Sequence, residues 1–183
     1  MTSEASVWTE GWWNGATRSA SPNFDTRPVE TDVKLVVLHH ISLPAGQFEG
    51  DAVRDFFENR LDVVHYPMLG ELADVHVSAH FFLRRAGEVL QFGSCDDRAW
   101  HAGVSAWRGR GGCNDFSIGI EIEGDAVAPF ADPQYASLDV LLVAIKQNYP
   151  IKAVTTHSEI APGRKIDPGP TFDWSRLGAR WHA

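Results

Sequence analysis

The alternation of apolar and polar positions along the chain predicts short strands, a hairpin and loops. Residues 33–38, VKLVVL, form a short run rich in β-branched side chains, which is typical of a buried central strand. Residues 78–84 and 88–92 flank an Ala-Gly pair that suits a tight hairpin turn. Residues 116–123, FSIGIEIE, alternate as a strand does, and residues 21–28, with two prolines, are expected to form an ordered loop.

Residues 51–60 and 133–148 have the spacing of amphipathic helices. Asp51 and Asp132 are the candidate N-terminal caps, and Pro133 falls in the first turn, where proline is tolerated. With the strands, these helices predict an α/β (α+β) fold in which one mixed sheet is covered by helices. The apolar stripes are Val53, Phe56 and Phe57 in the first helix, and Tyr135, Leu138, Leu142 and Ile145 in the second.

Length, charge and cysteine content narrow the class of protein. The 183 residues suit one domain, so we expect residues 1–183 to form a single unit. A net charge of -8 disfavours nucleic-acid binding, and no apolar run approaches the roughly 18 residues that a membrane span needs. The first residues lack the pattern of a secretory signal, which predicts a cytoplasmic protein. Cys95 and Cys113 are expected to be free buried thiols.

Two adjacent histidines, His39 and His40, end the first predicted strand. Strand ends deliver side chains into surface clefts. Neighbouring strand residues point to opposite faces, so one of the pair would serve a given site while the other packs or meets a ligand. A lone histidine is more often structural than catalytic, and periodicity does not choose between the two.

Residues 156–174, THSEIAPGRKIDPGPTFDW, are a second candidate segment, because three prolines stiffen the stretch that holds His157, Lys165 and Asp167. Asp167 precedes a proline and is biased to extended backbone. This predicts that its side chain lies on the same side as that of Lys165. A surface ion pair on a turn would explain the pattern equally well.

Glu121 is the third candidate. Alternation places Phe116 and the isoleucines on one face of the strand, and Ser117, Gly119, Glu121 and Glu123 on the other. A carboxylate in mid-strand beside small residues lowers the stability of the fold unless it is paired or has a functional role. The alternative is a strand face open to solvent, on which both glutamates only aid solubility.

Together these groups form a coherent hydrolytic set. Two histidines and an aspartate can hold Zn²⁺ with one position left for water. The metal would lower the pKa of that water toward about 7. Glu121 could take the proton and pass it to a leaving amine, and Lys165 could face the oxyanion. The reaction that this set suits is amide hydrolysis.

Five runs of the chain carry a family resemblance: VVLHHISLP (36–44), VSAHFFLRRAGEVLQF (77–92), RAWHAGVS (98–105), CNDFSIGIEIEG (113–124) and HSEIAPGRKIDPGPTFDW (157–174). In this order they closely resemble the AmpD family, cytoplasmic 1,6-anhydro-N-acetylmuramyl-L-alanine amidases of bacterial cell-wall recycling, which are related to peptidoglycan recognition proteins. The resemblance extends over nearly the whole chain, from about Glu10 to Trp174. It implies zinc bound by the three residues His39, His157 and Asp167, with Glu121 and Lys165 as the polar catalytic groups, and so selects the first histidine of the pair.

The resemblance also implies a fold and a substrate. The fold would be a peptidoglycan-recognition-protein-like amidase domain, a central mixed sheet flanked by helices. In its cleft, His40, Ala99 and Trp100 would meet a small muropeptide, anhydromuramyl-tripeptide or its disaccharide form. The bond between the lactyl group and L-alanine would be hydrolysed. We expect a monomer with no nucleic-acid or membrane partner.

Three positions depart from the family pattern, because His40 replaces an asparagine, and His76 and Gly112 replace arginines. Such arginines suit bidentate capture of peptide carboxylates, so their absence predicts a weaker or rearranged grip on the peptide. Packing, hydrogen bonding or surface positions, not metal binding, are expected of the remaining histidines, which are His65, His80, His101 and His182.

Two other functions fit parts of this pattern. A non-catalytic peptidoglycan-binding module is the first, but such relatives have usually lost zinc ligands, whereas all three are present here. The second is an amidase acting on polymeric peptidoglycan. Enzymes of that kind usually need export or a wall-binding appendage, and the sequence contains no sign of either.

Overall fold

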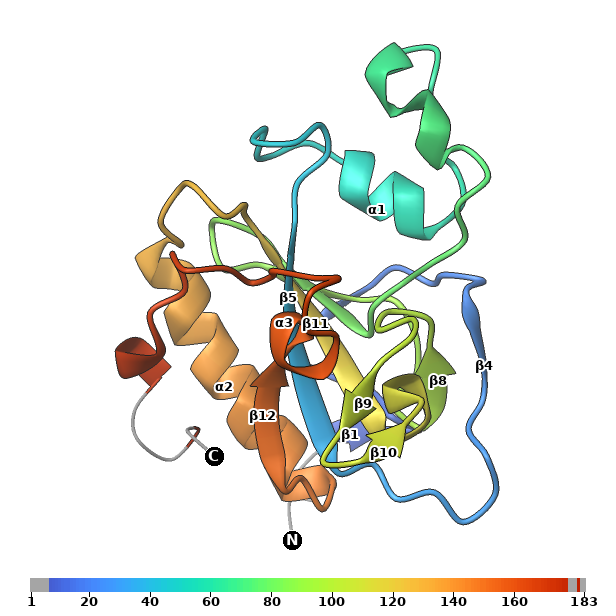
Figure 1. Ribbon diagram of the computed structural model, residues 1–183, viewed down its shortest axis with the longest axis vertical. Helices are drawn as coiled ribbons and strands as arrows, with labels where there is room; N and C mark the ends of the chain where they lie inside the picture. The colour runs from blue at the N-terminus through green and yellow to red at the C-terminus, as the bar shows by residue number, and fades with distance from the viewer. Residues whose placement is uncertain (1–6, 178–180, 182–183) are drawn as a thin grey trace, which may run out of the picture.

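A six-stranded mixed sheet forms the centre of the computed structural model, which describes residues 7–177 and 181 (Figure 1). Its strands are β3 (Thr17–Arg18), β5 (Leu35–Ile41), β6 (Phe81–Leu83), β7 (Val89–Gln91), β11 (Ser117–Glu123) and β12 (Ala153–Thr156). They lie in the order β12-β5-β11-β6-β7-β3. Neighbours are parallel except for β6 and β7, which are antiparallel. The expected mixed sheet is therefore present.

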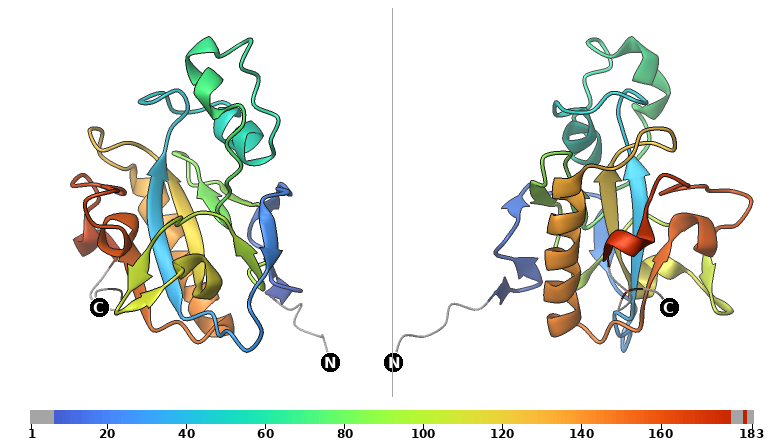
Figure 2. Two further views of the ribbon diagram at one scale, coloured as in Figure 1. Left: turned by 45° about the vertical axis from the view of Figure 1, so that its right-hand side comes forward. Right: turned by 90° about the vertical axis from the view of Figure 1, so that its left-hand side faces the viewer.

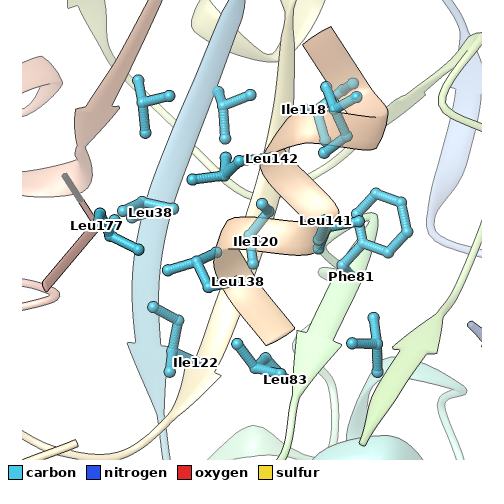
Figure 3. Packing of buried hydrophobic residues seen from close by; sticks show 14 of the residues in the cluster. Leu38, Phe81, Leu83, Ile118, Ile120, Ile122, Leu138, Leu141, Leu142 and Leu177 are labelled. Atoms are coloured by element: carbon cyan, nitrogen blue, oxygen red, sulfur yellow. The ribbon is translucent and has the colours of Figure 1, made fainter. Parts of the chain in front are cut away.

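One face of the sheet is covered by the long helix α2 (Asp132–Asn148), as the right-hand view of Figure 2 shows. Ile118 and Ile120 of β11 pack against Leu138, Leu141 and Leu142 of α2 (Figure 3), and each of these five side chains is at most 1% exposed. Burial of a leucine or isoleucine side chain contributes about 1.5–3 kcal/mol. This face is thus filled by the main core.

The opposite face carries a smaller apolar cluster, in which Leu35 and Val37 of β5 pack with Cys113, Phe116 and Ile160. The short helix α3 (His157–Ile160) and the chain between β7 and β11 lie on this side (Figure 2). Because residues two apart on a strand share a face, the next odd-numbered residue of β5, at position 39, also faces this side.

The remaining elements are short. A third apolar cluster surrounds α1 (Ala52–Phe57). The 3-10 helices are η1 (Pro67–Leu72), η2 (Cys113–Phe116) and η3 (Trp174–Leu177). Three antiparallel ribbons pair β1 (Trp8–Thr9) with β2 (Trp12–Trp13), β4 (Phe24–Thr26) with β8 (Asp97–Ala99), and β9 (Ala106–Trp107) with β10 (Arg110–Gly111). None of the helices described is long and apolar enough to cross a membrane.

The main elements expected from periodicity are confirmed. The run at 33–38 becomes β5, which lies inside the sheet between β12 and β11. β6 and β7 form the expected hairpin, and Gly87 in its turn has a φ of 89°, a value that favours glycine. The stripe predicted for the second helix is buried.

Of the two predicted helix caps, Asp51 takes the cap position of α1, whereas Asp132 does not take that of α2. Asp132 lies inside α2, whose N-terminal cap is Ala131, and Gln134 Oε1 accepts a hydrogen bond from the Ala131 N–H at 2.9 Å. Asp51 precedes α1 but makes no capping hydrogen bond. Its carboxylate instead pairs with Arg84 at 2.6 Å, a partner more than thirty positions away that local pattern cannot reveal.

Two further expectations are corrected. Residues 21–28 are not all loop, because Phe24 in β4 pairs with Ala99 in β8. Phe116 does not share a face with the isoleucines of β11. Phe116 lies in η2, and strand alternation begins only at Ser117, so the face of Phe116 does not follow from the period-two pattern of β11.

Candidate metal centre

The carboxyl ends of β12, β5 and β11 lie side by side, because these strands are parallel neighbours. His39 lies near the end of β5, and His157 directly follows β12, in which Thr156 pairs with Leu38. Glu121 pairs with His39 in the register of β11 and β5. The side chains of this pair therefore leave the same face of the sheet, about 4.8 Å apart at the backbone.

Three donor atoms converge at these strand ends. His39 Nδ1 lies 2.9 Å from His157 Nδ1 and 3.1 Å from Asp167 Oδ2. His157 Nδ1 lies 2.9 Å from the same carboxylate oxygen. All three residues are buried. Within the described part of the chain, this is the group of histidine, cysteine and acidic side chains that could share one metal ion.

The donor set fits Zn²⁺ in chemistry and in spacing. Two imidazole nitrogens and one carboxylate oxygen match the ligands of catalytic zinc sites, which keep a further position open. Ligand atoms about 2.0–2.1 Å from a tetrahedral ion lie about 3.3 Å from one another. The three spacings here, 2.9, 3.1 and 2.9 Å, are close to that value. The predicted ligands are thus brought together in a suitable arrangement.

A capping box at the start of α3 fixes the backbone around His157. Glu159 N–H donates to Thr156 Oγ1 at 3.2 Å, and Thr156 N–H donates to Glu159 Oε2 at 3.1 Å. Ser158 N–H donates to the Asp167 carbonyl at 3.0 Å. These bonds join the strand end, the helix start and the loop that carries Asp167, so two of the three donors are preorganised together.

The protonation states of the donors suit cation binding. Burial lowers the pKa of His39 to about 4, so this ring is neutral at neutral pH. Burial by itself would raise the pKa of Asp167, but its contacts with His157 and His39 hold that pKa well below its ordinary value. A neutral imidazole and an ionised carboxylate are the forms that bind a metal.

Glu121 lies beside these donors with a free oxygen. Its side chain is partly exposed, yet Oε2 is buried and has no hydrogen-bond partner among the described residues. Burial, reinforced by the charge of Asp167, raises the pKa of Glu121 well above its ordinary value, whereas the charge of Lys165 opposes that rise. Such a carboxyl group can exchange a proton with a reacting group, so a purely solubilising role does not fit.

Glu123 proves to be structural, contrary to the solvent-exposed alternative. It is 3% exposed, and both carboxylate oxygens accept backbone hydrogen bonds. Oε1 accepts from Glu49 N–H and Oε2 from Arg85 N–H, each at 2.8 Å. The side chain therefore ties the loop after β5 and the hairpin turn to the end of β11.

Lys165 is exposed on the loop between α3 and Asp167. Its charge acts on the pKa values of both Glu121 and His39, so its ammonium group lies within electrostatic reach of the same site. Asp167 differs from Lys165 in being buried. The ion pair on a turn that would have explained this segment is not observed, because Asp167 pairs with the two histidines instead.

The expected substrate contacts lie in different surroundings. His40 is half-buried, and its Nε2 atom is buried without a hydrogen-bond partner in the described residues. Trp100 is partly exposed, and its side chain donates a hydrogen bond to Asp25. Ala99 is 0% exposed, because it is the paired end of β8, so it offers no surface for the contact expected of it.

The positions that depart from the family pattern lie outside the donor cluster, the three candidate metal ligands His39, His157 and Asp167. His76 is exposed, and its Nδ1 lies 3.2 Å from Asn59 Nδ2. Gly112 has a φ of 70° and precedes η2, a conformation in which an arginine would be strained. Cys95 and Cys113 are free and buried, as expected.

Of the remaining histidines, His65 is exposed and His80 is buried, while His182 lies outside the described residues. The hydrogen bonding expected of His101 is observed, because its Nδ1 lies 2.9 Å from His39 Nε2. No sequence pattern indicated that its partner would be a residue of the candidate metal site. The place of His101 beside that site is therefore what sequence reasoning missed.

Comparison with known proteins places this geometry in a family. Residues 29–170 match the Amidase_2 model, N-acetylmuramoyl-L-alanine amidase. The 1,6-anhydro-N-acetylmuramyl-L-alanine amidase AmpD of Escherichia coli is 47% identical over 170 residues, which are 92% of this chain and 93% of that protein. The match to the family model includes every residue of the proposed site.

Solved structures agree with the fold. A crystal structure of a selenomethionine AmpD derivative has a TM-score of 0.91 at 45% identity, covering 94% of this chain and 98% of that one. The amidase AmiD from E. coli, in complex with the substrate anhydro-N-acetylmuramic acid-L-Ala-D-gamma-Glu-L-Lys, has a TM-score of 0.61 at 30% identity, covering 97% and 66%.

A complex of peptidoglycan recognition protein ectodomains has a TM-score of 0.56 at 17% identity, covering 84% of each chain, which shows a shared fold alone. The expected peptidoglycan-recognition-protein-like architecture is confirmed. From the family match and the AmpD identity it follows that the chain belongs to the N-acetylmuramoyl-L-alanine amidase family and is an amidase.

Proposed function

We propose that this amidase is zinc-dependent and hydrolyses the bond between the lactyl group and L-alanine in 1,6-anhydro-N-acetylmuramyl peptides during cell-wall recycling. The observation that carries the proposal is the convergence of His39 Nδ1, His157 Nδ1 and Asp167 Oδ2 beside Glu121. The identity to AmpD and the anhydromuropeptide bound in the AmiD complex support the choice of substrate.

His39, His157 and Asp167 would hold the zinc. When bound, Zn²⁺ supplies Lewis acidity, which polarises a carbonyl and makes water a nucleophile at neutral pH. Glu121 acts as the proton carrier. Its Oε2 accepts a proton from the water that attacks the amide carbonyl and returns it to the departing amine of L-alanine. The raised pKa of Glu121 favours the step in which its carboxylate takes up a proton.

Lys165 is assigned to the developing charge on the carbonyl oxygen. Its ammonium group is exposed at the edge of the donor cluster, where a substrate carbonyl can reach it. By analogy with measured oxyanion donors, such a contact contributes on the order of 3–4 kcal/mol to the transition state. His40 and Trp100 would line the cleft.

The decisive experiment compares two substrates with and without metal. Purified protein is assayed with anhydromuramyl-tripeptide and with intact sacculi, after zinc loading and after treatment with a chelator. We expect turnover of the soluble muropeptide by the zinc-loaded protein, and loss of that turnover with the chelator. Turnover confined to sacculi would instead identify an amidase of the polymer, and turnover of neither substrate would favour the binding module.

A monomeric, cytoplasmic enzyme remains part of this proposal. A soluble fragment of the wall is a small substrate that one copy of the cleft can accommodate, and AmpD-like relatives support action on such fragments. Sedimentation at several protein concentrations tests the monomer, and cell fractionation tests the location.

A further inference from the structure

A chain of hydrogen bonds leads from the metal-binding histidine of β5 into the protein. His39 Nε2 lies 2.9 Å from His101 Nδ1, and His101 Nε2 lies 3.1 Å from Ser117 Oγ. Ser117 Oγ donates to the Cys113 carbonyl at 2.6 Å. The chain thus begins at the nitrogen of His39 that faces away from the donor cluster and ends on a backbone carbonyl.

The last acceptor fixes the direction of every proton in this chain. A carbonyl oxygen can only accept, so the Ser117 hydroxyl donates its single proton to the Cys113 carbonyl. The Ser117 oxygen must then accept from His101, which places the His101 proton on Nε2. The Nδ1 atom of His101 is left to accept from His39 Nε2–H. His39 consequently presents the lone pair of Nδ1 to the donor cluster.

The second histidine ligand is oriented by the same stretch of chain. His157 Nε2 lies 3.1 Å from the Ala102 carbonyl and 3.4 Å from Arg164 Nη2. The closer of these neighbours can only accept, which favours a proton on Nε2 and an unprotonated Nδ1. Arg164 also donates to the Ala102 and Val104 carbonyls at 2.7 Å each. Residues 101 and 102 therefore contact the Nε2 atoms of both ligands, one with a side chain and one with its backbone.

Gly119 provides the space that His101 occupies. A Cβ atom at position 119 would lie 2.5 Å from His101 Cγ and 2.7 Å from its Nδ1. Real side chains do not approach so closely, so the strand beneath the ring must carry glycine for the ring to lie there. Glycine at this position of β11 is thus explained by the place of His101.

We propose that His101 is a positioning residue for the metal centre, which holds His39 in the tautomer and orientation that present Nδ1 to zinc, with Ser117 as its anchor. The inference rests on the proposed zinc dependence. Loss of a group that hydrogen-bonds to the ring nitrogen not bound to metal typically weakens metal binding 10- to 100-fold. What distinguishes this case is that the acceptor is a second imidazole, whose own tautomer is set by a serine.

The test measures zinc affinity by competition with a chromophoric chelator, together with the unfolding of the zinc-free protein. His101→Phe keeps the ring shape but removes both nitrogens, and we expect zinc binding about 10- to 100-fold weaker. His101→Asn should recover part of this loss, because its Oδ1 can replace Nδ1 as the acceptor. Ser117→Ala should weaken zinc binding by a smaller factor.

Ser78→Ala is the matched control for Ser117→Ala, because Ser78 is also buried and donates to a backbone carbonyl, that of Ala79. We expect its zinc affinity to equal that of the parent protein. A merely structural role for His101 would lower unfolding stability in both His101 variants without the partial recovery of zinc affinity by asparagine.

Nitrogen-15 spectra of the histidine rings in the zinc-loaded parent protein test the tautomers directly, even if His101→Phe does not fold. Protons on Nε2 of both His39 and His101 are expected. A proton on His101 Nδ1, or unchanged zinc affinity in a folded His101→Phe protein, would overturn the inference while leaving the proposed function intact. A parent protein that binds no zinc would overturn the proposed function itself.

Discussion

Glu121 and Asp167 are two carboxyl groups of one site whose pKa values are shifted in opposite directions. Glu121 has a buried oxygen without a partner, and burial raises its pKa. Asp167 is also buried, but its contacts with His157 and His39 lower its pKa despite that burial. Such a separation assigns separate tasks, because one group can carry a proton while the other stays ionised as a ligand.

Glu121→Gln should abolish most turnover while leaving the metal in place. Glutamine has nearly the same shape but cannot accept the proton, so we expect kcat to fall by about 100- to 10,000-fold. Zinc content by atomic absorption should match that of the parent protein. Near-normal kcat in the substituted enzyme would remove Glu121 from the proton-transfer role.

Asp167→Ala should release zinc as well as activity. It removes the one oxygen among the three candidate metal ligands. Loss of a residue that only hydrogen-bonds to a ligand weakens metal binding by up to about 100-fold, so we expect the loss of a ligand itself to exceed that factor. Asp173→Ala is the control, because that exposed carboxylate bonds to Ser175 within its own turn. Undiminished zinc in the Asp167 variant would exclude this residue from the ligand set.

At the scale of elements, α3 matters more than its four residues suggest. A helix of this length is not stable alone, so its start depends on the capping box of Thr156 and Glu159 and on its attachment to β12. The first residue of α3 is His157. The cap therefore holds a ligand as well as a helix end.

Thr156→Ala should lower the free energy of unfolding of the zinc-free protein by about 1 kcal/mol, the usual loss for a capping hydroxyl. Thr156→Ser keeps the oxygen that accepts from Glu159 N–H and should retain most of the stability. Urea denaturation of both variants measures the difference. Equal destabilisation by alanine and serine would mean that the methyl group, not the cap, is responsible.

At the scale of the whole molecule, a buried guanidinium holds the chain before β11 against the sheet. Arg27 donates to the carbonyls of Cys95, Asn114, Asp115 and Ser117. Its Nη2 atom also lies 3.1 Å from His80 Nε2. This cluster lies behind the donor site and supports the segment that supplies His101, so the metal centre depends on distant parts of the chain.

The buried histidines predict a stability that falls in mild acid. Burial, with the charge of Arg27, lowers the pKa of His80 to about 3, against an ordinary value of 6.5. Between these values the unfolded chain binds a proton that the native protein does not, so unfolding becomes more favourable as pH falls. For His80 alone the loss of stability between about pH 6.5 and about pH 4.5 is about 2 kcal/mol.

His80→Asn isolates this contribution, since its Oδ1 can still accept from Gly119 N–H but does not titrate. We expect the zinc-free variant to be less stable than the parent at neutral pH, but to lose less stability on acidification. Urea unfolding at several pH values measures the two slopes. Parallel pH profiles would show that His80 does not carry this dependence.

Elements whose evidence is local could be predicted from the sequence alone. The spacing of apolar residues predicted which side chains are buried in two elements, the β-branched run at 33–38 and the stripe from Tyr135 to Ile145. This works because the positions that face the core repeat with the period of the strand or helix and must be apolar. The motif runs also indicated the family and the ligand types. Residue chemistry limits what a site can do before its geometry is known.

Which of these residues meet depends on the way the chain folds in three dimensions. His39 faces the donors because β5 lies between β12 and β11, and Glu121 joins it through strand register. The partners of Glu123 and the bond from His39 to His101 join segments tens of residues apart. Such contacts depend on how the strands pair, and local periodicity carries no record of pairing, because it reports only whether a side chain faces the core.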